Sequence, residues 1–361
     1  MLVFSNRELE TANSGVALTR RFQPGADRLS AVEATRSASG SGFDLSATDA
    51  AIADDAAVKR FVPLFRGSKP VLVYLHGNNN TPKSCFERCA RLQETYDVAV
   101  VGFSWPSEGF LSSGDDLPKL PIGNGKDDIG SDDSLAGIDA GNRKEGWAEL
   151  KIRRYRQAKL NAQESGDALA RFLRLLATAR LYVNQQRVTL AAHSLGCHLL
   201  QYTIETEGAA EALGSCHNIA LLAACCRADG HESWVGKLNP KGQTFIAYNK
   251  GDSVLFGAYI ADGQQTKLGT EPGDRIMAAP RVRYISFTNA QVGFGGHTYF
   301  VRKAGDKLPK APKKVFSRIF GSEQDIREAQ GEYPRKVYPV GCDEDGTTCY
   351  MGPPPQEPDG R

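Results

Sequence analysis

Continuous apolar runs mark the middle of the chain. Residues 70–75 read Pro-Val-Leu-Val-Tyr-Leu, and residues 98–103 read Val-Ala-Val-Val-Gly-Phe. Runs of this length without polar alternation are typical of strands that are buried on both faces. The stretch 82–94 between them begins with a proline, which suits a first helical turn, and predicts a helix. A strand, a helix and a second strand in this order indicate a parallel sheet.

The alternation of strands and helices continues in the second half of the chain. One helix face is marked by apolar residues at helical spacing, namely Leu169, Phe172, Leu173 and Leu176. We therefore expect a long helix that packs on a sheet. Four more apolar runs predict strands at 187–192, 219–224, 244–248 and 282–287. The fold class is α/β, with a mostly parallel central sheet flanked by helices.

Three stretches depart from this rhythm and suggest the domain organisation. Residues 1–66 start with a short apolar run and continue through a Ser-, Gly- and Ala-rich middle, so we expect an N-terminal extension with one small strand and partly irregular structure. The α/β domain covers 67–301, and its segment 104–150, rich in Gly and Asp, predicts an inserted loop or lid. Residues 302–361 form a C-terminal extension. Its basic part at 302–314 is expected to be a solvated linker.

Composition and charge narrow the classes of function. The 44 Lys and Arg against 42 Asp and Glu give a net charge of +2, which supplies no general field for phosphate, so we expect no nucleic-acid partner. The start of the chain lacks signal-peptide features, and no stretch reaches the roughly 18 apolar residues that span a bilayer. We expect a cytoplasmic protein with reduced cysteines and no transmembrane segment. Cys85 and Cys89, and the adjacent Cys225 and Cys226, have no histidine at ligand spacing, so no metal site is expected.

Ser194 stands where a strand runs directly into a helical pattern. The local sequence is Ala-His-Ser-Leu-Gly, with Ala192 two residues before the serine and Gly196 two residues after it. A turn that holds a nucleophilic serine above a sheet edge must be tight and needs small residues at these two positions. The alternative is an ordinary serine that caps a helix. The strand before it and the helix after it favour the nucleophile.

The loop after the first buried strand, with the sequence His-Gly-Asn-Asn-Asn at 76–80, suits an oxyanion hole. Acyl transfer needs hydrogen-bond donors aimed at the oxygen that becomes negative. The backbone N–H of Leu195, directly after the nucleophile, supplies one donor, and we expect Asn78 to supply the second. A tight turn explains the same residues, because Gly and Asn tolerate positive φ.

Three further residues are expected to line the substrate pocket: Gly77, His193 and Trp105. Trp105 follows the end of the second buried strand, so core packing is an equal alternative for its ring.

A serine nucleophile needs a histidine base, which a carboxylate must orient. The expected chain order is serine, acid, histidine. Of the six histidines, His297 alone follows both the serine and a plausible acid loop, and we expect a helix after its glycine-rich loop. Asp252 comes directly after the strand at 244–248 and is the favoured acid. Asp229, after the preceding strand, is its rival.

The ordered series of motifs resembles a bacterial α/β-hydrolase family of unknown function. The series consists of His-Gly-Asn-Asn-Asn at 76–80, Phe-Ser-Trp-Pro-Ser at 103–107, Arg-Tyr-Arg-Gln-Ala at 154–158, the serine turn, Asn-Lys-Gly-Asp at 249–252 and Gly-His-Thr-Tyr at 296–299. The resemblance implies an α/β-hydrolase fold with a triad of Ser194, Asp252 and His297. It implies no substrate, because this family is defined by fold.

The resulting hypothesis is a serine hydrolase that cleaves a carboxylic ester through an acyl-enzyme, as a carboxylesterase or lipase does. Such an enzyme needs no cofactor. An acidic lid disfavours anionic substrates, so we expect a small neutral acyl compound. A thioesterase or an amidase uses the same triad. A hydrolase-fold protein that binds ligands or partners without turnover is the alternative from another class.

Overall fold

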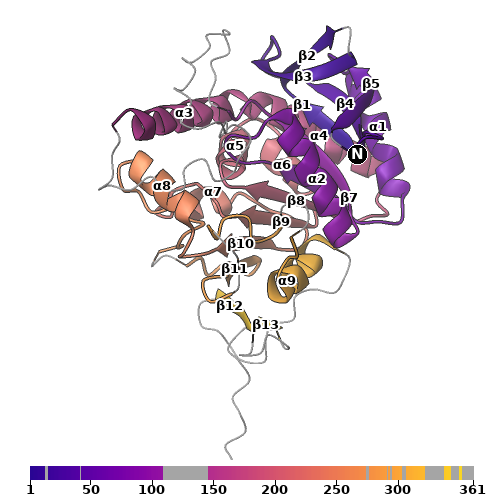
Figure 1. Ribbon diagram of the computed structural model, residues 1–361. Coiled ribbons are helices and arrows are strands. Elements are labelled where there is room, and N and C mark those ends of the chain that lie inside the picture. The colour runs from indigo at the N-terminus through magenta and orange to yellow at the C-terminus, as the bar shows by residue number, and fades with distance from the viewer. Residues whose placement is uncertain are drawn as a thin grey trace, which may run out of the picture.

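The computed structural model describes most of the chain (Figure 1). The described residues are 1–12, 15–40, 42–108, 145–273, 276–290, 292, 295–302, 306–321, 337–342 and 349–351. The strands are β1 (Leu2–Ser5), β2 (Arg7–Ala12), β3 (Gly15–Phe22), β4 (Ser30–Arg36), β5 (Phe43–Asp49), β6 (Val71–Leu75), β7 (Ala99–Ser104), β8 (Val188–His193), β9 (Asn218–Leu222), β10 (Thr244–Tyr248), β11 (Val282–Ser286), β12 (Val337–Cys342) and β13 (Cys349–Met351). The helices are α1 (Asp54–Arg66), α2 (Pro82–Tyr96), α3 (Glu145–Glu164), α4 (Gly166–Tyr182), α5 (Gly196–Thr203), α6 (Ala209–Leu213), α7 (Glu232–Val235), α8 (Ser253–Ala261) and α9 (Lys310–Phe320).

In this part of the chain one large sheet has the strand order β13-β12-β11-β10-β9-β8-β6-β7-β1-β4-β5. The strands from β12 through to β1 pair in parallel, whereas β4, β5 and β13 at the two ends are antiparallel. All six strands predicted from apolar runs lie in this sheet, as β6 to β11. The predicted α/β-hydrolase fold, with a mostly parallel sheet flanked by helices, is confirmed.

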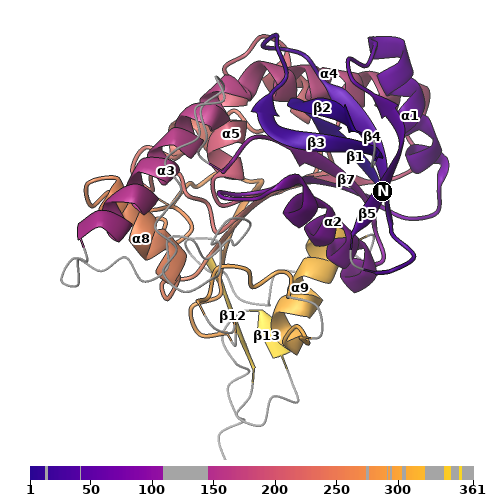
Figure 2. The same ribbon diagram turned by 45° about the horizontal axis from the view of Figure 1, so that its top comes forward.

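Helices cover both faces of the sheet (Figure 2). The helices α1, α4, α5, α3 and α8 contact one another in series on one face, while α2 and α9 contact each other on the opposite face. The long helix predicted around residue 170 is in fact two helices, α3 and α4, which meet at Ser165. The Ser165 hydroxyl donates to the Asn161 carbonyl at 2.7 Å and so competes with the backbone bonds of the helix.

The first 66 residues are more regular than the sequence predicted. Strand β1 inserts into the sheet between β7 and β4, and β2 pairs with β3 in a separate two-stranded sheet. The predicted small strand corresponds to β1, whereas the prediction of irregular structure after it is wrong, because β2 to β5 and α1 follow. Along β4 the burial pattern changes from continuous to alternating. Most of its exposed positions are polar, so no long apolar run in the sequence predicts this strand.

The basic stretch at 302–314 is only partly a linker. Helix α9 begins at Lys310, and its apolar face is buried, with Ala311, Val315, Phe316 and Ile319 among the covered residues. The lysines lie between these positions and obscure the apolar stripe in the sequence. The insertion expected at 104–150 is described only up to Glu108 and again from α3, so the predicted lid at 109–144 lies outside the described residues.

The strand order reverses next to β8. From β6 the chain adds β7 on one side and then places β8 on the other side. In open α/β sheets, ligands bind at the carboxyl ends of the strands where the order reverses in this way. The end of β6 leads into the loop at 76–80, and the end of β8 leads into Ser194, so both candidate elements flank this crevice.

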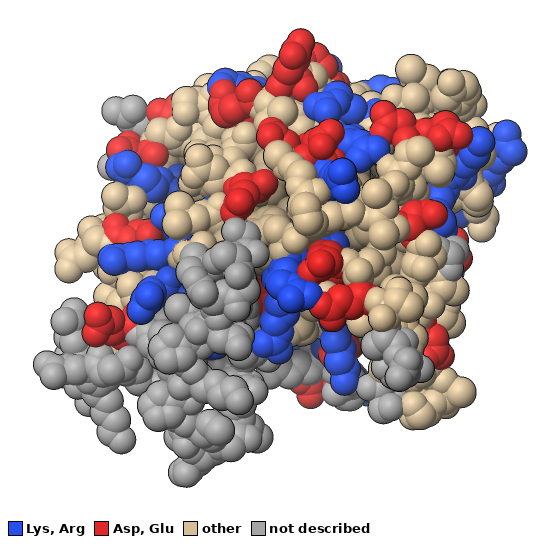
Figure 3. Space-filling model, turned by 90° about the horizontal axis from the view of Figure 1, so that it is seen from above, with Lys and Arg blue, Asp and Glu red and all other residues tan. Residues whose placement is uncertain are grey.

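None of the helices in the described residues is long and apolar enough to cross a membrane. On the face seen from above, Lys and Arg side chains are interspersed with Asp and Glu side chains (Figure 3). The mixed surface agrees with the small net charge of +2.

Candidate active site

Ser194 forms a strained turn between β8 and α5. Its φ is 52°, a left-handed conformation that residues other than glycine rarely adopt. The turn is held by three backbone hydrogen bonds. The Ser194 N–H donates to the Leu222 carbonyl at 2.9 Å, and the Ser194 carbonyl accepts from Cys197 at 3.1 Å and Cys225 at 3.1 Å. A serine held in this conformation at the end of a central strand has the geometry of a nucleophile elbow.

Two glycines allow the elbow to lie against the loop after β6. A Cβ on Gly77 would lie 2.8 Å from the Ser194 Cβ, and a Cβ on Gly196 would lie 2.7 Å from the His76 carbonyl oxygen. Side chains larger than hydrogen would therefore push β6 and β8 apart at this edge. The two glycines explain how the predicted oxyanion loop and the predicted nucleophile come into direct contact.

His297 and Asp252 form a buried hydrogen-bonded pair. The His297 Nδ1 and the Asp252 Oδ2 lie 2.7 Å apart, and both side chains are almost fully buried. The other Asp252 oxygen caps α8, because it accepts from the N–H of Val254 at 3.0 Å and of Leu255 at 2.9 Å. Burial raises the pKa of the Asp252 carboxyl, and His297 and these two amides oppose that rise.

Asp229, the rival acid, lies elsewhere. Its side chain is 76% exposed and pairs with Arg227 at 3.7 Å. The hydrogen-bond partner of His297 is Asp252.

The loop that carries His297 crosses the ends of the neighbouring strands. The Asn249 side-chain amide donates to the Gly296 carbonyl at 2.9 Å. The Tyr299 hydroxyl donates to the Ala247 carbonyl at 2.8 Å and accepts from the Ala223 N–H at 3.0 Å. The helix predicted after His297 is absent from the described residues 298–302, because Tyr299 and the residue after it are buried against the sheet edge instead of forming a stripe.

His193 links the two halves of the site. Its ring centroid lies 4.7 Å from that of His297 and 4.9 Å from that of Phe300. Burial, with a contribution from His297, lowers the pKa of His193 well below its usual range, so its imidazole is neutral. Among the described residues no hydrogen bond joins the Ser194 hydroxyl to His297. Catalytic hydrogen bonds are often long before a substrate binds and shorten in its presence.

A comparison with known families covers the first half of this site. Residues 54–223 match a family model described as alpha/beta hydrolase of unknown function (DUF900). This part of the chain is similar to that α/β-hydrolase family. The resemblance drawn from the sequence motifs is thereby confirmed. No curated protein and no solved structure matches the chain.

The matched stretch of the hydrolase contains Ser194 and the loop at 76–80. Asp252 and His297 lie beyond it. Their contact is therefore an observation of the structure that the family match does not supply.

A buried ion pair holds the loop after β6 in place. This pair was not predicted from the sequence. The Arg7 guanidinium bonds to the Glu108 carboxylate at 2.9 Å and 3.0 Å, and both side chains are fully buried. Arg7 also donates to the Asn80 carbonyl at 2.9 Å and to the Trp105 carbonyl. Burial raises the pKa of Glu108, and Arg7 opposes that rise. The two residues are 101 positions apart, so no local pattern links them.

Ser107 also holds this loop, through two hydrogen bonds. Its carbonyl accepts from the Asn79 N–H at 2.7 Å, and its hydroxyl accepts from the Asn80 N–H at 2.9 Å. Asn78, the expected oxyanion donor, is the half-buried residue just before these two bonds. The loop is thus held directly after Gly77 and Asn78.

Trp105 lies behind the loop and is fully buried. Its indole N–H donates to the His76 carbonyl at 3.0 Å, and its ring stacks on the His76 ring at 5.5 Å. Its backbone N–H donates to the His76 Nε2 at 3.1 Å, so the other nitrogen carries the proton and donates to the Gly77 carbonyl at 3.0 Å. The geometry favours the alternative of core packing for Trp105.

Proposed function

We propose that the protein is a serine hydrolase that cleaves carboxylic esters through an acyl-enzyme. The observation that carries the proposal is the buried His297–Asp252 pair at 2.7 Å, beside a serine held at a φ of 52°. A carboxylate on Nδ1 fixes the tautomer in which Nε2 accepts a proton. This is the state that a general base for Ser194 requires.

In the proposed reaction the Ser194 hydroxyl attacks the carbonyl carbon of the ester and His297 accepts its proton. The imidazolium is stabilised by Asp252. The N–H groups of Leu195 and Asn78 bind the negative oxygen of the tetrahedral intermediate. His297 returns the proton to the departing alcohol. A water molecule, which gives a proton to His297, then attacks the acyl-enzyme and releases the carboxylic acid from Ser194.

The substrate class follows from the chemistry of the triad and from charge. Esters need less activation than amides, so a carboxylesterase or lipase is proposed, with a small neutral acyl compound as substrate and no nucleic-acid partner. Gly77 and His193 are proposed to line the pocket, since both lie against the Ser194 turn or the His297 ring. We place this activity in the cytoplasm, in a domain that spans 67–301.

Labelling with a fluorophosphonate tests the nucleophile. We expect one adduct on the parent protein, located on Ser194 by peptide mass spectrometry, and none on Ser194→Ala. Ser46→Ala, on the antiparallel edge strand β5, is the matched control and should label like the parent. A folded parent protein that takes no label on Ser194 would overturn the proposal and favour a binding protein without turnover.

A panel of p-nitrophenyl esters, matched thioesters and anilides tests the bond. The proposal expects kcat/KM to be highest for the esters, and Ser194→Ala should hydrolyse none of them. Faster turnover of thioesters or anilides would reassign the protein as a thioesterase or an amidase with the same triad.

A further inference from the structure

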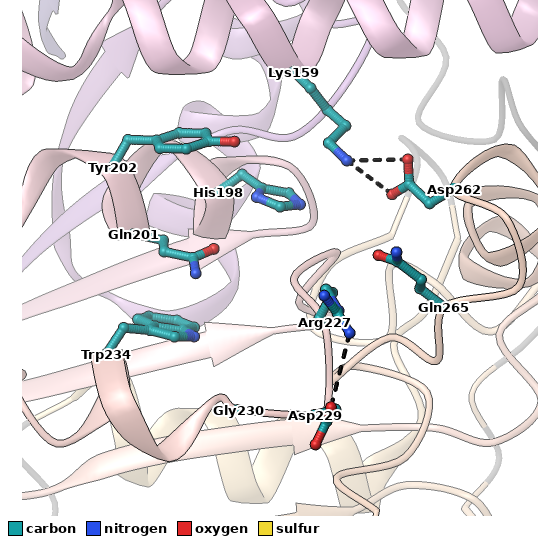
Figure 4. Close-up of a pocket in the computed structure, with 10 residues that line it drawn as sticks. All are labelled: Lys159, His198, Gln201, Tyr202, Arg227, Asp229, Gly230, Trp234, Asp262 and Gln265. Carbon is teal, nitrogen blue, oxygen red and sulfur yellow. Dashed lines mark hydrogen bonds and ion pairs between the residues drawn. The ribbon is translucent and has the colours of Figure 1, made fainter.

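A cavity lies beside α5, and neither His297 nor Asp252 is among its lining residues (Figure 4). It has a volume of about 370 Å³, which is at the lower end of the range for small-molecule sites. Its walls come from α3, α5, α7 and the segments that follow β9 and α8. The lining residues are Lys159, His198, Gln201, Tyr202, Arg227, Asp229, Gly230, Trp234, Asp262 and Gln265.

His198 is the unusual member of this lining. It is only 7% exposed, and neither of its ring nitrogens makes a hydrogen bond of good geometry among the described residues, although the Cys225 backbone lies close enough to oppose the fall in its pKa. Burial, with smaller contributions from Lys159 and Lys267, lowers the pKa of His198 to about 3, so the ring is neutral. A neutral imidazole has one donor and one acceptor, and leaving both unbonded in a buried site costs free energy. The ring faces the cavity, where a ligand is able to bond to it (Figure 4).

The charges beside His198 leave a positive surplus. Asp262 accepts from Lys159 at 3.0 Å, from Lys267 and, at 2.9 Å, from the Tyr155 hydroxyl. Two cations thus share one carboxylate. Arg227 and Asp229 add one charge of each sign and form only a loose pair at 3.7 Å, with the Arg227 side chain 57% exposed. The net charge of the described lining residues together with Lys267 is therefore +1.

The two ends of the cavity differ in chemistry. Tyr202 and Trp234 lie at one end, and the charged groups lie at the other (Figure 4). The Tyr202 ring also stacks on His198, with a centroid separation of 5.9 Å. The apolar ring faces lie at one end, and the surplus positive charge, the loosely paired Arg227 and the unbonded His198 ring lie toward the other. This arrangement suits a molecule that has a hydrocarbon part and a single negative charge.

We propose that this cavity binds a small organic monocarboxylate. The planar carboxylate would accept from Lys159, His198 and Arg227, and the hydrocarbon part would lie against Trp234 and Tyr202. A phosphate monoester fits less well, because its charge of nearly −2 exceeds the surplus of the site. The inference does not depend on the proposed reaction, since Ser194 and His297 do not line this cavity.

Sodium benzoate is the probe for the test. Calorimetric titration of the full chain should show saturable binding of benzoate, with at least tenfold weaker binding of neutral benzamide, cationic benzylamine and dianionic phenyl phosphate. Ring ¹³C–¹H NMR signals of His198 should shift on binding, which locates the ligand independently of the heat. The same titration on Ser194→Ala should give the same affinity, so this result stands or fails apart from the proposed reaction.

Three variants locate the site. Arg227→Gln should weaken benzoate binding at least tenfold and, because Arg227 is largely exposed, should fold normally. His198→Leu, which keeps the volume and removes both nitrogens, should weaken it as much. Lys59→Gln, an exposed member of an ion pair on α1, is the control and should bind like the parent.

The proposal is overturned if benzoate does not bind to the folded protein. It is also overturned if benzamide or phenyl phosphate binds as tightly as benzoate, or if Arg227→Gln and His198→Leu both retain the parent affinity.

Discussion

The candidate active site and the cavity beside α5 both contain buried histidines, and His297 in the first differs from His198 in the second in its hydrogen bonds. In the candidate active site, His297 bonds to Asp252 at 2.7 Å, and the loop opposite is fastened by the Arg7–Glu108 pair. In the cavity, neither nitrogen of His198 makes a hydrogen bond of good geometry among the described residues. Buried polar groups in folded proteins are nearly always bonded. Groups bonded within the protein hold a geometry in place. His193 in the candidate active site also makes no hydrogen bond of good geometry through either ring nitrogen among the described residues, so each region contains an imidazole that is able to bond to a ligand.

Asp252→Asn gives the largest expected effect, because it breaks the pair in the candidate active site with little change in shape. Asparagine is able to cap α8 as aspartate does, but its N–H opposes the tautomer that His297 needs. We expect a loss of about 10⁴-fold in kcat for a p-nitrophenyl ester. Asp229→Asn, at the cavity, should leave kcat unchanged. The reverse result would return Asp229 to the role of triad acid.

Arg7→Met tests the fastening of the loop after β6. It leaves Glu108 buried without its partner, and breaking a buried pair in this way costs about 3–5 kcal/mol of unfolding free energy. Urea unfolding followed by circular dichroism measures the loss. Arg21→Met removes an exposed, paired arginine and should cost less than about 1 kcal/mol. A cost for Arg7→Met as small as that for Arg21→Met would show that the ion pair does not hold this edge together.

The pH dependence of stability tests the state of the cavity histidine, His198. The folded pKa of His198 is about 3, below the unfolded value of about 6.5. As pH falls below 6.5, the unfolded chain gains a proton that the folded protein does not, so stability decreases until pH reaches the folded pKa. Between pH 6.5 and 5, one such histidine lowers the free energy of unfolding by about 2 kcal/mol.

His198→Leu should therefore reduce the acid-induced loss of stability by that share, as measured by urea unfolding at the two pH values. His76, which is also lowered to a pKa of about 3, supplies a further share that remains in this variant. An equally steep loss in His198→Leu and in the parent would mean that His198 is already protonated or bonded in the folded protein.

Two tryptophans provide the smallest and most closely matched comparison. The indole N–H of Trp105 donates to the His76 carbonyl at 3.0 Å, whereas the indole of Trp234 makes no hydrogen bond among the described residues. Trp105→Phe should cost about 1 kcal/mol more than Trp234→Phe because of the lost bond. Thermal unfolding of the two variants side by side measures the difference. Equal losses of stability would indicate that packing alone determines the effect of the substitution at both positions.

The sequence predicted well wherever the physical cause is local. Strands buried on both faces need continuous apolar runs, so β6 to β11 were located from the sequence, and the turn at Ser194 was identified from its small neighbours. Strand β1 coincides with the short apolar run at the start of the chain and was expected. The strands β2 to β5 contain many polar residues, and the lysines of α9 interrupt its apolar stripe, so these elements were missed.

The candidate site was predictable only in part for a related reason. The order of strands in the chain limits which loops can carry the acid and the base, and this favoured Asp252 and His297. Arg7 bonds to Glu108 from 101 positions away, and the cavity beside α5 is assembled from several separate segments. Contacts of this kind depend on the finished packing and leave no periodic pattern in the sequence.

The position of β1 in the sheet has a consequence for synthesis on the ribosome. Arg7 emerges 101 residues before Glu108. At about 5–20 residues per second the ribosome needs roughly 5–20 seconds to supply this distance. During that time β1 is able to pair with β4, its antiparallel neighbour, but its parallel edge has no β7 to meet. The loop after β6 therefore reaches its final form only after Glu108 has been synthesised, when the Arg7 guanidinium gains its carboxylate partner.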